Sequence, residues 1–156
     1  MSGSYLPPGL PQPRPSADRL DGPYWEGTLE HELRIQRCGS CRAWQWGPEW
    51  ICHQCLGDSM GYESIEPRGV IYSWERVWHP VHPALGHAVP YLIVLVTLPQ
   101  AGGVRTLGNL VGDPLQEVEI GAPVEAVFED HLDGEPPFTL VQWRRDHSAV
   151  NPASAE

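Results

Sequence analysis

The distribution of apolar residues along the chain predicts one short helix followed by a second half made of strands. Between Asp21 and Leu33 four large apolar side chains recur at helical spacing, namely Tyr24, Trp25, Leu29 and Leu33. Asp21 can cap this helix, and Pro23 suits its first turn, where a missing N–H does no harm. A helix of this length needs tertiary packing to be stable, so we expect it to lie against another part of the fold.

Beyond residue 66 the pattern changes to short apolar segments separated by turns rich in glycine and proline. The segments are Val70–Trp78, Tyr91–Leu98, Val104–Val111, Pro123–Glu129 and Phe138–Trp143. In the first, Tyr72, Trp74 and Trp78 alternate with other residues, as side chains that face a core do. The second is continuously apolar, as in a strand buried on both faces. Five strands with such turns predict a small barrel of the OB type or a sandwich.

Four cysteines stand in two close pairs between the helix and the strands. Cys38 and Cys41 are separated by two residues, ten residues follow, and Cys52 and Cys55 repeat the same spacing. Two intervening residues let a tight turn direct both sulfurs at one ion, and two such turns complete a tetrahedron around Zn²⁺. Because four thiolates leave no coordination position open, the pattern predicts a structural zinc ribbon and not a catalytic metal.

Other interpretations of the cysteines remain open from the sequence alone. Two disulfides or a redox dithiol would use the same residues, and His53 could replace one cysteine as a ligand. Arg37 and Arg42 could offset the negative charge that four thiolates leave on the ion. Gly39 and Gly57 stand where tight turns favour glycine.

The charge and composition of the chain limit the kinds of partner that it can bind. With 20 acidic and 10 basic residues the formal charge is −10, which disfavours nucleic acid because phosphate contacts need clustered Lys and Arg. There is no apolar run of about 18 residues and no signal-peptide pattern, so we expect no membrane contact and a cytoplasmic location.

The patterns together divide the chain into four parts. We expect a Pro-rich extended tail (1–20), a helix and zinc ribbon (21–66), a barrel (67–147) and a disordered tail (148–156).

Aromatic and basic residues supply candidate contact sites. Trp44, Trp46 and Trp50 fall within the cysteine segment, where they either cover the metal or form an exposed platform for a ligand or partner. Three tryptophans exceed what one small hairpin buries, so some should meet another surface. Candidates for an anion site are the arginines 68, 76, 105, 144 and 145, because a guanidinium matches phosphate geometry, although each also fits an ordinary surface charge.

No motif of a catalytic site is present in the sequence. His79, His82 and His87 share a proline-rich loop without a carboxylate, so solvated histidines are favoured over a metal or acid–base site. Carboxylates cluster between Glu117 and Glu135; a solvated acidic rim is favoured over a glycosidase-like pair. We therefore expect no catalytic residues.

The order of the segments resembles a known family. The segments that carry the likeness are Pro23–Gly27, Leu33–Cys41, Cys52–Cys55, Gly69–Ser73, Val77–Pro80, Pro90–Leu98, Gly108–Gly112 and Ile120–Phe128. They are similar to an acyl-CoA-associated family that joins a rubredoxin-like zinc ribbon to an OB-fold, formerly a domain of unknown function. The likeness covers about residues 21–143. One departure is Glu49, which follows Pro48 where the family often has arginine.

The resemblance implies a mainly β protein, with an N-terminal helix and rubredoxin-like ribbon before a five-stranded OB barrel. Members of the family look like non-catalytic partners of thiolase-like or lipid-transfer-protein-type enzymes, or are fused to hydratase-like domains. The function expected is thus an accessory subunit in a hetero-oligomer with an aldolase or thiolase, in steroid side-chain degradation. It would contact acyl-CoA or its partner through Trp44, Trp46, Trp50, Arg105 and Arg144. The alternative is a single-stranded nucleic-acid-binding OB protein.

Overall fold

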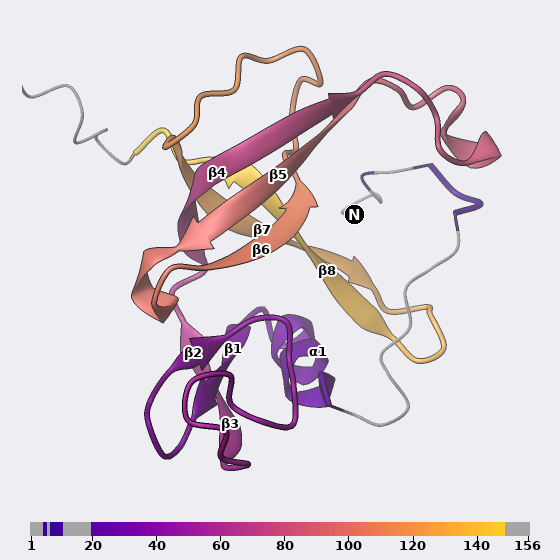
Figure 1. Ribbon diagram of the computed structural model, residues 1–156. Coiled ribbons are helices and arrows are strands. Elements are labelled where there is room, and N and C mark those ends of the chain that lie inside the picture. The colour runs from indigo at the N-terminus through magenta and orange to yellow at the C-terminus, as the bar shows by residue number, and fades with distance from the viewer. Residues whose placement is uncertain (1–4, 6, 11–19, 149–156) are drawn as a thin grey trace, which may run out of the picture.

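The computed structural model describes residues 5, 7–10 and 20–148, and it is mainly β (Figure 1). Within these residues there are one α-helix, a three-stranded ribbon sheet and a five-stranded barrel sheet. The tails predicted for residues 1–20 and 148–156 lie largely outside the described residues. No helix of the described part has the length and apolar character needed to cross a bilayer.

The predicted helix forms but is shorter than expected. Helix α1 spans Gly22–Leu29 with Pro23 in its first turn. The Asp21 side chain does not cap it: the Asp21 carboxylate instead accepts a 2.8 Å hydrogen bond from the Trp25 indole. His31 follows with a left-handed φ of 59°, and the chain then reverses. The prediction that Leu33 belongs to the helix is wrong, because Leu33 opens the first strand, where it is buried.

The ribbon sheet contains β1 (Leu33–Cys38), β2 (Trp44–Gln45) and β3 (Met60–Ile65) in the antiparallel order β2-β1-β3. Leu33 and Ile35 of β1 are almost fully buried and belong to the same apolar cluster as the barrel core. The base of the ribbon is therefore part of the main core, whereas the cysteine turns lie beyond it.

The barrel consists of five strands in the order β6-β5-β4-β7-β8. They are β4 (Arg68–Val77), β5 (Tyr91–Leu98), β6 (Val104–Asn109), β7 (Pro123–His131) and β8 (Phe138–Arg145), with 3-10 turns at Pro83–Leu85 and Pro99–Ala101. A parallel bridge between Leu110 and Trp143 joins the β6 end to β8, so the sheet nearly closes. Four antiparallel pairs and one parallel closure are the topology of an OB barrel.

Two places in β4 show how the barrel is shaped. Gly69 is buried where an added Cβ would lie 2.4 Å from Val96 Cγ1 and 2.5 Å from the Thr97 carbonyl oxygen, so the close approach of β5 requires glycine. The pairing with β5 slips between Ile71 and Ser73, which marks a β-bulge. Ile71, just before the bulge, is buried, and its neighbour Tyr72 is exposed.

The prediction that the aromatic residues of β4 face the core is wrong. Tyr72 is 48% exposed, Trp74 36% and Trp78 57%, and the large buried side chain on this strand is Ile71. Neighbouring side chains alternate between the two faces of a strand, so Tyr72 lies on the face opposite the buried Ile71. Alternation in the sequence alone does not say which of the two sets of side chains faces the core. By contrast, β5 has the predicted limits, and the other strands differ from prediction only at their ends.

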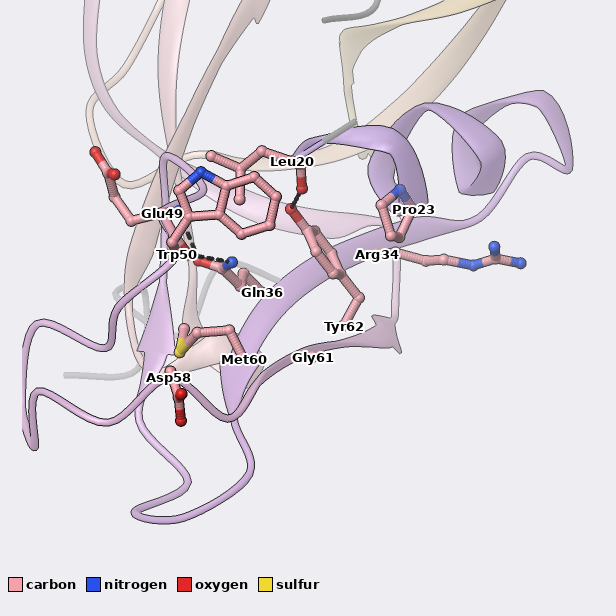
Figure 2. A pocket seen from close by; sticks show the side chains of 10 residues that line it. All are labelled: Leu20, Pro23, Arg34, Gln36, Glu49, Trp50, Asp58, Met60, Gly61 and Tyr62. Carbon is pink, nitrogen blue, oxygen red and sulfur yellow. Dashed lines mark hydrogen bonds between the residues drawn. The ribbon is translucent and has the colours of Figure 1, made fainter. Parts of the chain in front are cut away.

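A groove of about 610 Å³ lies between the start of α1 and the ribbon (Figure 2). Its lining comes from the segment at the start of the helix, from β1 and β3, and from the loops before and after the second cysteine pair. The members are Leu20, Pro23, Arg34, Gln36, Glu49, Trp50, Asp58, Met60, Gly61 and Tyr62. This groove is separate from the barrel strands.

Candidate metal centre and exposed surfaces

The two cysteine pairs form two turns with the same hydrogen-bond pattern. Arg42 N donates to the Cys38 carbonyl (3.0 Å), and Leu56 N donates to the Cys52 carbonyl (2.9 Å). Arg42 and Leu56 both have left-handed φ values, 65° and 58°. In each turn, the left-handed backbone conformation thus falls on the residue that follows the second cysteine of the pair, and this residue is not a glycine.

Gly39 and Gly57 do not supply the turn conformation that their positions predicted. Neither has a positive φ. A Cβ on Gly39 would stand 2.7 Å from Ser59 Oγ, so glycine lets the first turn approach the chain before β3. A Cβ on Gly57 would stand 3.4 Å from Cys55 Sγ, an ordinary contact distance, so the structure does not require glycine there. Close approach therefore explains Gly39 and not Gly57.

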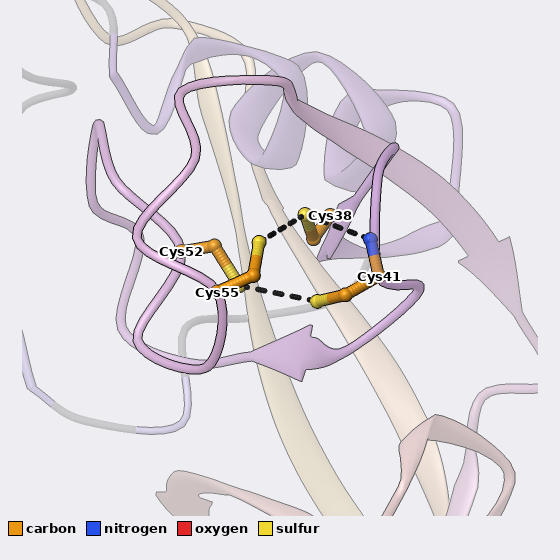
Figure 3. Close-up of side chains that lie close together, drawn as sticks. All are labelled: Cys38, Cys41, Cys52 and Cys55. Carbon is orange, nitrogen blue, oxygen red and sulfur yellow. Dashed lines mark hydrogen bonds between the residues drawn. The ribbon is translucent and has the colours of Figure 1, made fainter.

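The four sulfur atoms fit a tetrahedral Zn²⁺ site (Figure 3). They lie within 4.8 Å of one another, with 3.6 Å from Cys38 Sγ to Cys55 Sγ and 3.6 Å from Cys41 Sγ to Cys52 Sγ. Zn–S bonds of about 2.3 Å in a tetrahedron place the sulfurs about 3.8 Å apart. All four cysteines are free, and 3.6 Å is far beyond a disulfide bond of about 2.05 Å, so the disulfide alternative does not describe this structure.

The electrostatics of the cluster also suit a cation. The Cys41 N–H points at Cys38 Sγ (3.5 Å) and lowers the pKa of Cys38 to about 6. The Cys55 N–H likewise lowers the pKa of Cys52. At Cys41 the N–H of Ala43 acts in the same direction, but burial and the neighbouring thiols outweigh it and raise the pKa of Cys41 to about 12. The sulfurs resist becoming four thiolates by themselves, and a divalent cation supplies the missing positive charge.

The arginines beside the centre are engaged by a residue that the sequence reasoning missed. Arg37 Nη1 lies 2.7 Å and Arg42 Nη2 2.6 Å from the Glu63 carboxylate. The hydrogen bond from Arg37 lowers the pKa of Glu63. Arg37 also stacks over the Trp44 ring at 4.4 Å. Both arginines form ion pairs with Glu63, so they tie the first cysteine turn to β3 as well as placing positive charge near the metal centre.

The histidines do not extend the metal cluster. His53 Nδ1 lies 2.8 Å from Gln45 Oε1, so that ring is bonded to β2. His82 Nδ1 accepts a 3.1 Å hydrogen bond from Ala84 N and caps the 3-10 turn of its loop. In the described part of the chain, the cysteines form the one group of three or more His, Cys, Asp and Glu side chains close enough to share an ion.

The three tryptophans of the cysteine segment separate into two environments. Trp44 and Trp46 pack against the main core, and Trp46 contacts the Tyr24 ring with centroids 4.8 Å apart. Trp50 is 60% exposed and lines the groove beside the ribbon. Of the three predicted contact residues, the structure therefore leaves Trp50 on the surface.

The candidate arginines are mostly occupied within the chain. Arg144 bonds to Glu125 at 2.8 Å, Arg68 to Asp146 at 3.3 Å, and Arg76 to the carbonyls of the loop after β6. Arg105 forms no ion pair with any described residue and stacks over the Tyr72 ring at 3.5 Å. Arg105 and Tyr72 thus form an exposed pair on β6 and β4.

One member of the predicted acidic rim is buried. Glu129 is 5% exposed and accepts hydrogen bonds from His131 Nε2 and Gln142 Nε2, both at 2.9 Å. Gln142 Oε1 in turn accepts from Asn109 N at 2.9 Å. This connected polar group links the end of β6 to β8 beside the bridge that closes the barrel, so Glu129 is a structural carboxylate.

The sequence matches a known family across both parts of the fold. Residues 25–61 match the ChsH2 rubredoxin-like zinc ribbon domain, and residues 62–129 match the ChsH2 C-terminal OB-fold domain. The chain belongs to the ChsH2 family. The ribbon match and the four clustered cysteines support structural zinc as the metal of this ChsH2 chain.

Two relatives of this chain are longer proteins. A probable enoyl-CoA hydratase alpha subunit of Thermomonospora curvata is 34% identical over 135 residues, and the 3-oxo-4,17-pregnadiene-20-carboxyl-CoA hydratase alpha subunit of Mycobacterium tuberculosis is 36% identical over 135 residues. Each match covers 85% of this chain and 40% of the relative. The chain therefore spans less than half the length of these curated relatives.

Two solved structures share the fold. One chain of an Ltp2-ChsH2(DUF35) aldolase is 32% identical with a TM-score of 0.71, and the match covers 85% of this chain and 98% of that one. A DUF35-family protein of unknown function from Sulfolobus solfataricus is 16% identical with a TM-score of 0.56, covering 80% and 84%. The second likeness concerns the fold alone.

Proposed function

We propose that this chain is a non-catalytic accessory subunit that binds a thiolase-like, lipid-transfer-protein-type aldolase and helps to form its acyl-CoA site. The observation that carries the proposal is the match over 98% of a ChsH2-type chain from an Ltp2-ChsH2 aldolase, at 32% identity. A likeness over nearly the whole of that chain supports the same kind of role for this one.

The chemistry of the described residues agrees with an accessory role. Its four cysteines are arranged for a closed metal site, and Glu129 and His131 are bonded to each other within the barrel. Neither arrangement offers a nucleophile beside a free base. Catalysis in the complex would then come from the partner, in the cytoplasm, with this chain contributing surface and structure.

Steroid acyl-CoA is the proposed substrate class of the complex. A relative named as a pregnadiene-carboxyl-CoA hydratase subunit is 36% identical to this chain. If the chain touches CoA itself, Arg105 is a better candidate than Arg144 for a phosphate contact. Arg105 is exposed and has no ion pair among the described residues, whereas Arg144 is bonded to Glu125.

The experiment is co-expression with the Ltp2-type subunit of the same genome, followed by size exclusion and a retro-aldol assay on a steroid acyl-CoA. We expect a hetero-oligomer and activity that falls when this chain is omitted. A partner that is fully active alone and elutes without this chain contradicts the proposal. Arg105→Ala should weaken acyl-CoA binding to the complex if the guanidinium contacts phosphate, with Arg144→Ala as the comparison.

The alternative function, binding of single-stranded nucleic acid, draws support from one observation. Tyr72 is exposed on the barrel with the Arg105 guanidinium stacked on it, and OB barrels bind single strands through such rings and cations. The formal charge of −10 opposes it. Fluorescence polarisation with an unstructured oligonucleotide at low salt tests it, and binding that Tyr72→Ala abolishes would favour this alternative.

A further inference from the structure

We propose that the groove between α1 and the ribbon is a docking site for a segment of the partner protein that inserts one apolar side chain and carries basic residues beside it. The inference rests on the proposed accessory function and assigns a surface to it. Figure 2 shows Trp50, Met60 and Tyr62 around the middle of the groove, with Glu49, Asp58 and Arg34 directed outward at its edges.

The groove is formed before any partner arrives. The Gln36 side chain is buried, and its amide group both donates to the Glu49 carbonyl (2.8 Å) and accepts from Glu49 N (3.0 Å). This pair of bonds fixes the loop that carries Trp50 against β1. On the other side, Tyr62 donates a 2.8 Å hydrogen bond to the Leu20 carbonyl. Walls held in this way lose little conformational entropy when a ligand enters.

The middle of the groove is suited to an apolar side chain. Trp50 is 60% exposed although it stands in a preformed groove, so a large ring is available for burial. Met60 is adaptable and polarizable, which suits contact with a side chain of irregular shape. Leu20 and Pro23 add further apolar surface to the lining around Trp50. Exposed tryptophan in a pocket with apolar neighbours is the usual composition of a binding hot spot.

The charge at the edges of the groove selects the partner segment. Glu49 and Asp58 are exposed and form no ion pair with any described residue. Arg34 is already bonded to Glu30 and Glu32, so its charge is more than balanced. The rim is therefore net negative. Lysine or arginine next to the inserted apolar residue would complement it, and acidic segments would be repelled.

The test measures binding of the purified Ltp2-type subunit of the same genome to this chain by surface plasmon resonance, at low and high salt. Trp50→Ala should weaken binding by about tenfold or more. Its matched control is Trp78→Ala, because Trp78 is 57% exposed but lies beyond the end of β4. That control should change binding by less than about twofold. Zinc content and melting temperature establish that each variant is folded.

A charge pair of variants tests the second half of the proposal. The double change Glu49→Gln with Asp58→Asn should slow association about threefold at low salt and reduce its salt dependence. The control is the double change Glu75→Gln with Glu117→Gln, which removes two exposed carboxylates that line no part of the groove. This control should leave the association rate and its salt dependence unchanged.

The outcomes separate the two proposals. If the unmodified chain does not bind the Ltp2-type subunit, the accessory function is overturned and this docking site with it. If the unmodified chain binds but Trp50→Ala binds as tightly, the function stands and the docking site is overturned. A loss of affinity confined to the groove variants supports both.

Discussion

The ribbon tip and the barrel are stabilised by different means. The barrel buries a continuous cluster of large side chains, among them Leu92, Leu98 and Trp143 at 0% exposure. The tip beyond the two-residue strand β2 has Ile51 and Leu56 facing outward and four sulfurs at its centre. Burial of apolar surface can stabilise the barrel. The ribbon tip buries too little apolar surface for this and depends on metal–sulfur bonds.

The difference explains why the ribbon can present apolar groups without unfolding. A segment whose fold rests on its own apolar core needs most of its large apolar side chains for that core. In the ribbon, Zn²⁺ can fix the backbone from inside, and Leu33 and Ile35 anchor the base in the barrel core, so Trp50 stays available at the surface. Rigidity at the tip and exposure at the tip are thus compatible, and this combination suits a docking element.

The sharpest test of this contrast removes one metal ligand. Cys52→Ser should abolish binding of about one zinc per chain, because serine does not replace a thiolate on this ion. We expect the ribbon amides of residues 38–60 to lose hydrogen-exchange protection while β5 and β8 keep theirs. The melting temperature should fall by more than about 10 °C. Elemental analysis and exchange mass spectrometry measure the two effects.

His53→Ala is the matched control for the metal ligand, since His53 lies between the last two cysteines but its Nδ1 is bonded to Gln45. This variant should keep its zinc. Loss of zinc from His53→Ala, or retention by Cys52→Ser, would contradict the ligand set. A Cys52→Ser protein that loses protection equally in ribbon and barrel would break the distinction between the two regions.

A core substitution should give the converse result. Leu92→Ala removes a fully buried side chain of β5 and should lower the free energy of unfolding by about 2–5 kcal/mol. Zinc content should not change, because Leu92 is not in the ribbon. Leu132→Ala, at a position 67% exposed, is the control and should stay within about 0.5 kcal/mol. Urea unfolding measures both, and a Leu92→Ala protein as stable as its control would contradict the assigned core.

The smallest expected effect concerns the contact between the helix end and the barrel. His31 Nε2 lies 2.9 Å from Asp130, and this hydrogen bond lowers the pKa of Asp130. A lowered pKa means that the stabilisation is complete above the unfolded value of about 4 and is lost as the pH falls through the folded value.

Asp130→Asn should therefore cost less than about 1 kcal/mol near neutral pH, because the pair is partly exposed, and should cost nothing at a pH below both values. Urea unfolding at several pH values between neutral and strongly acidic checks this. A difference between variant and parent that does not shrink on acidification would show that the ionised Asp130 carboxylate is not its source.

The sequence predicted correctly those features that depend on residues close together in the chain. The spacing of the four cysteines predicted a ribbon, and the unbroken apolar run Tyr91–Leu98 predicted β5 with its correct limits. Neither depends on which distant segment lies alongside. Where the result depended on a distant partner, prediction failed: Glu63, the residue that engages both arginines of the ribbon, carries no signal in the sequence.

The amino-acid sequence by itself determined the kinds of element, their order and the metal chemistry, because these follow from the spacing of side chains within one segment. Tertiary structure decided which side chains are inside. Burial of Ile71 in the core left its neighbour Tyr72 on the outer face, a reversal after α1 moved Leu33 into a strand, and packing against the barrel separated Trp44 from Trp50. The physical reason is that burial is a property of register and contact between segments, which no local pattern specifies.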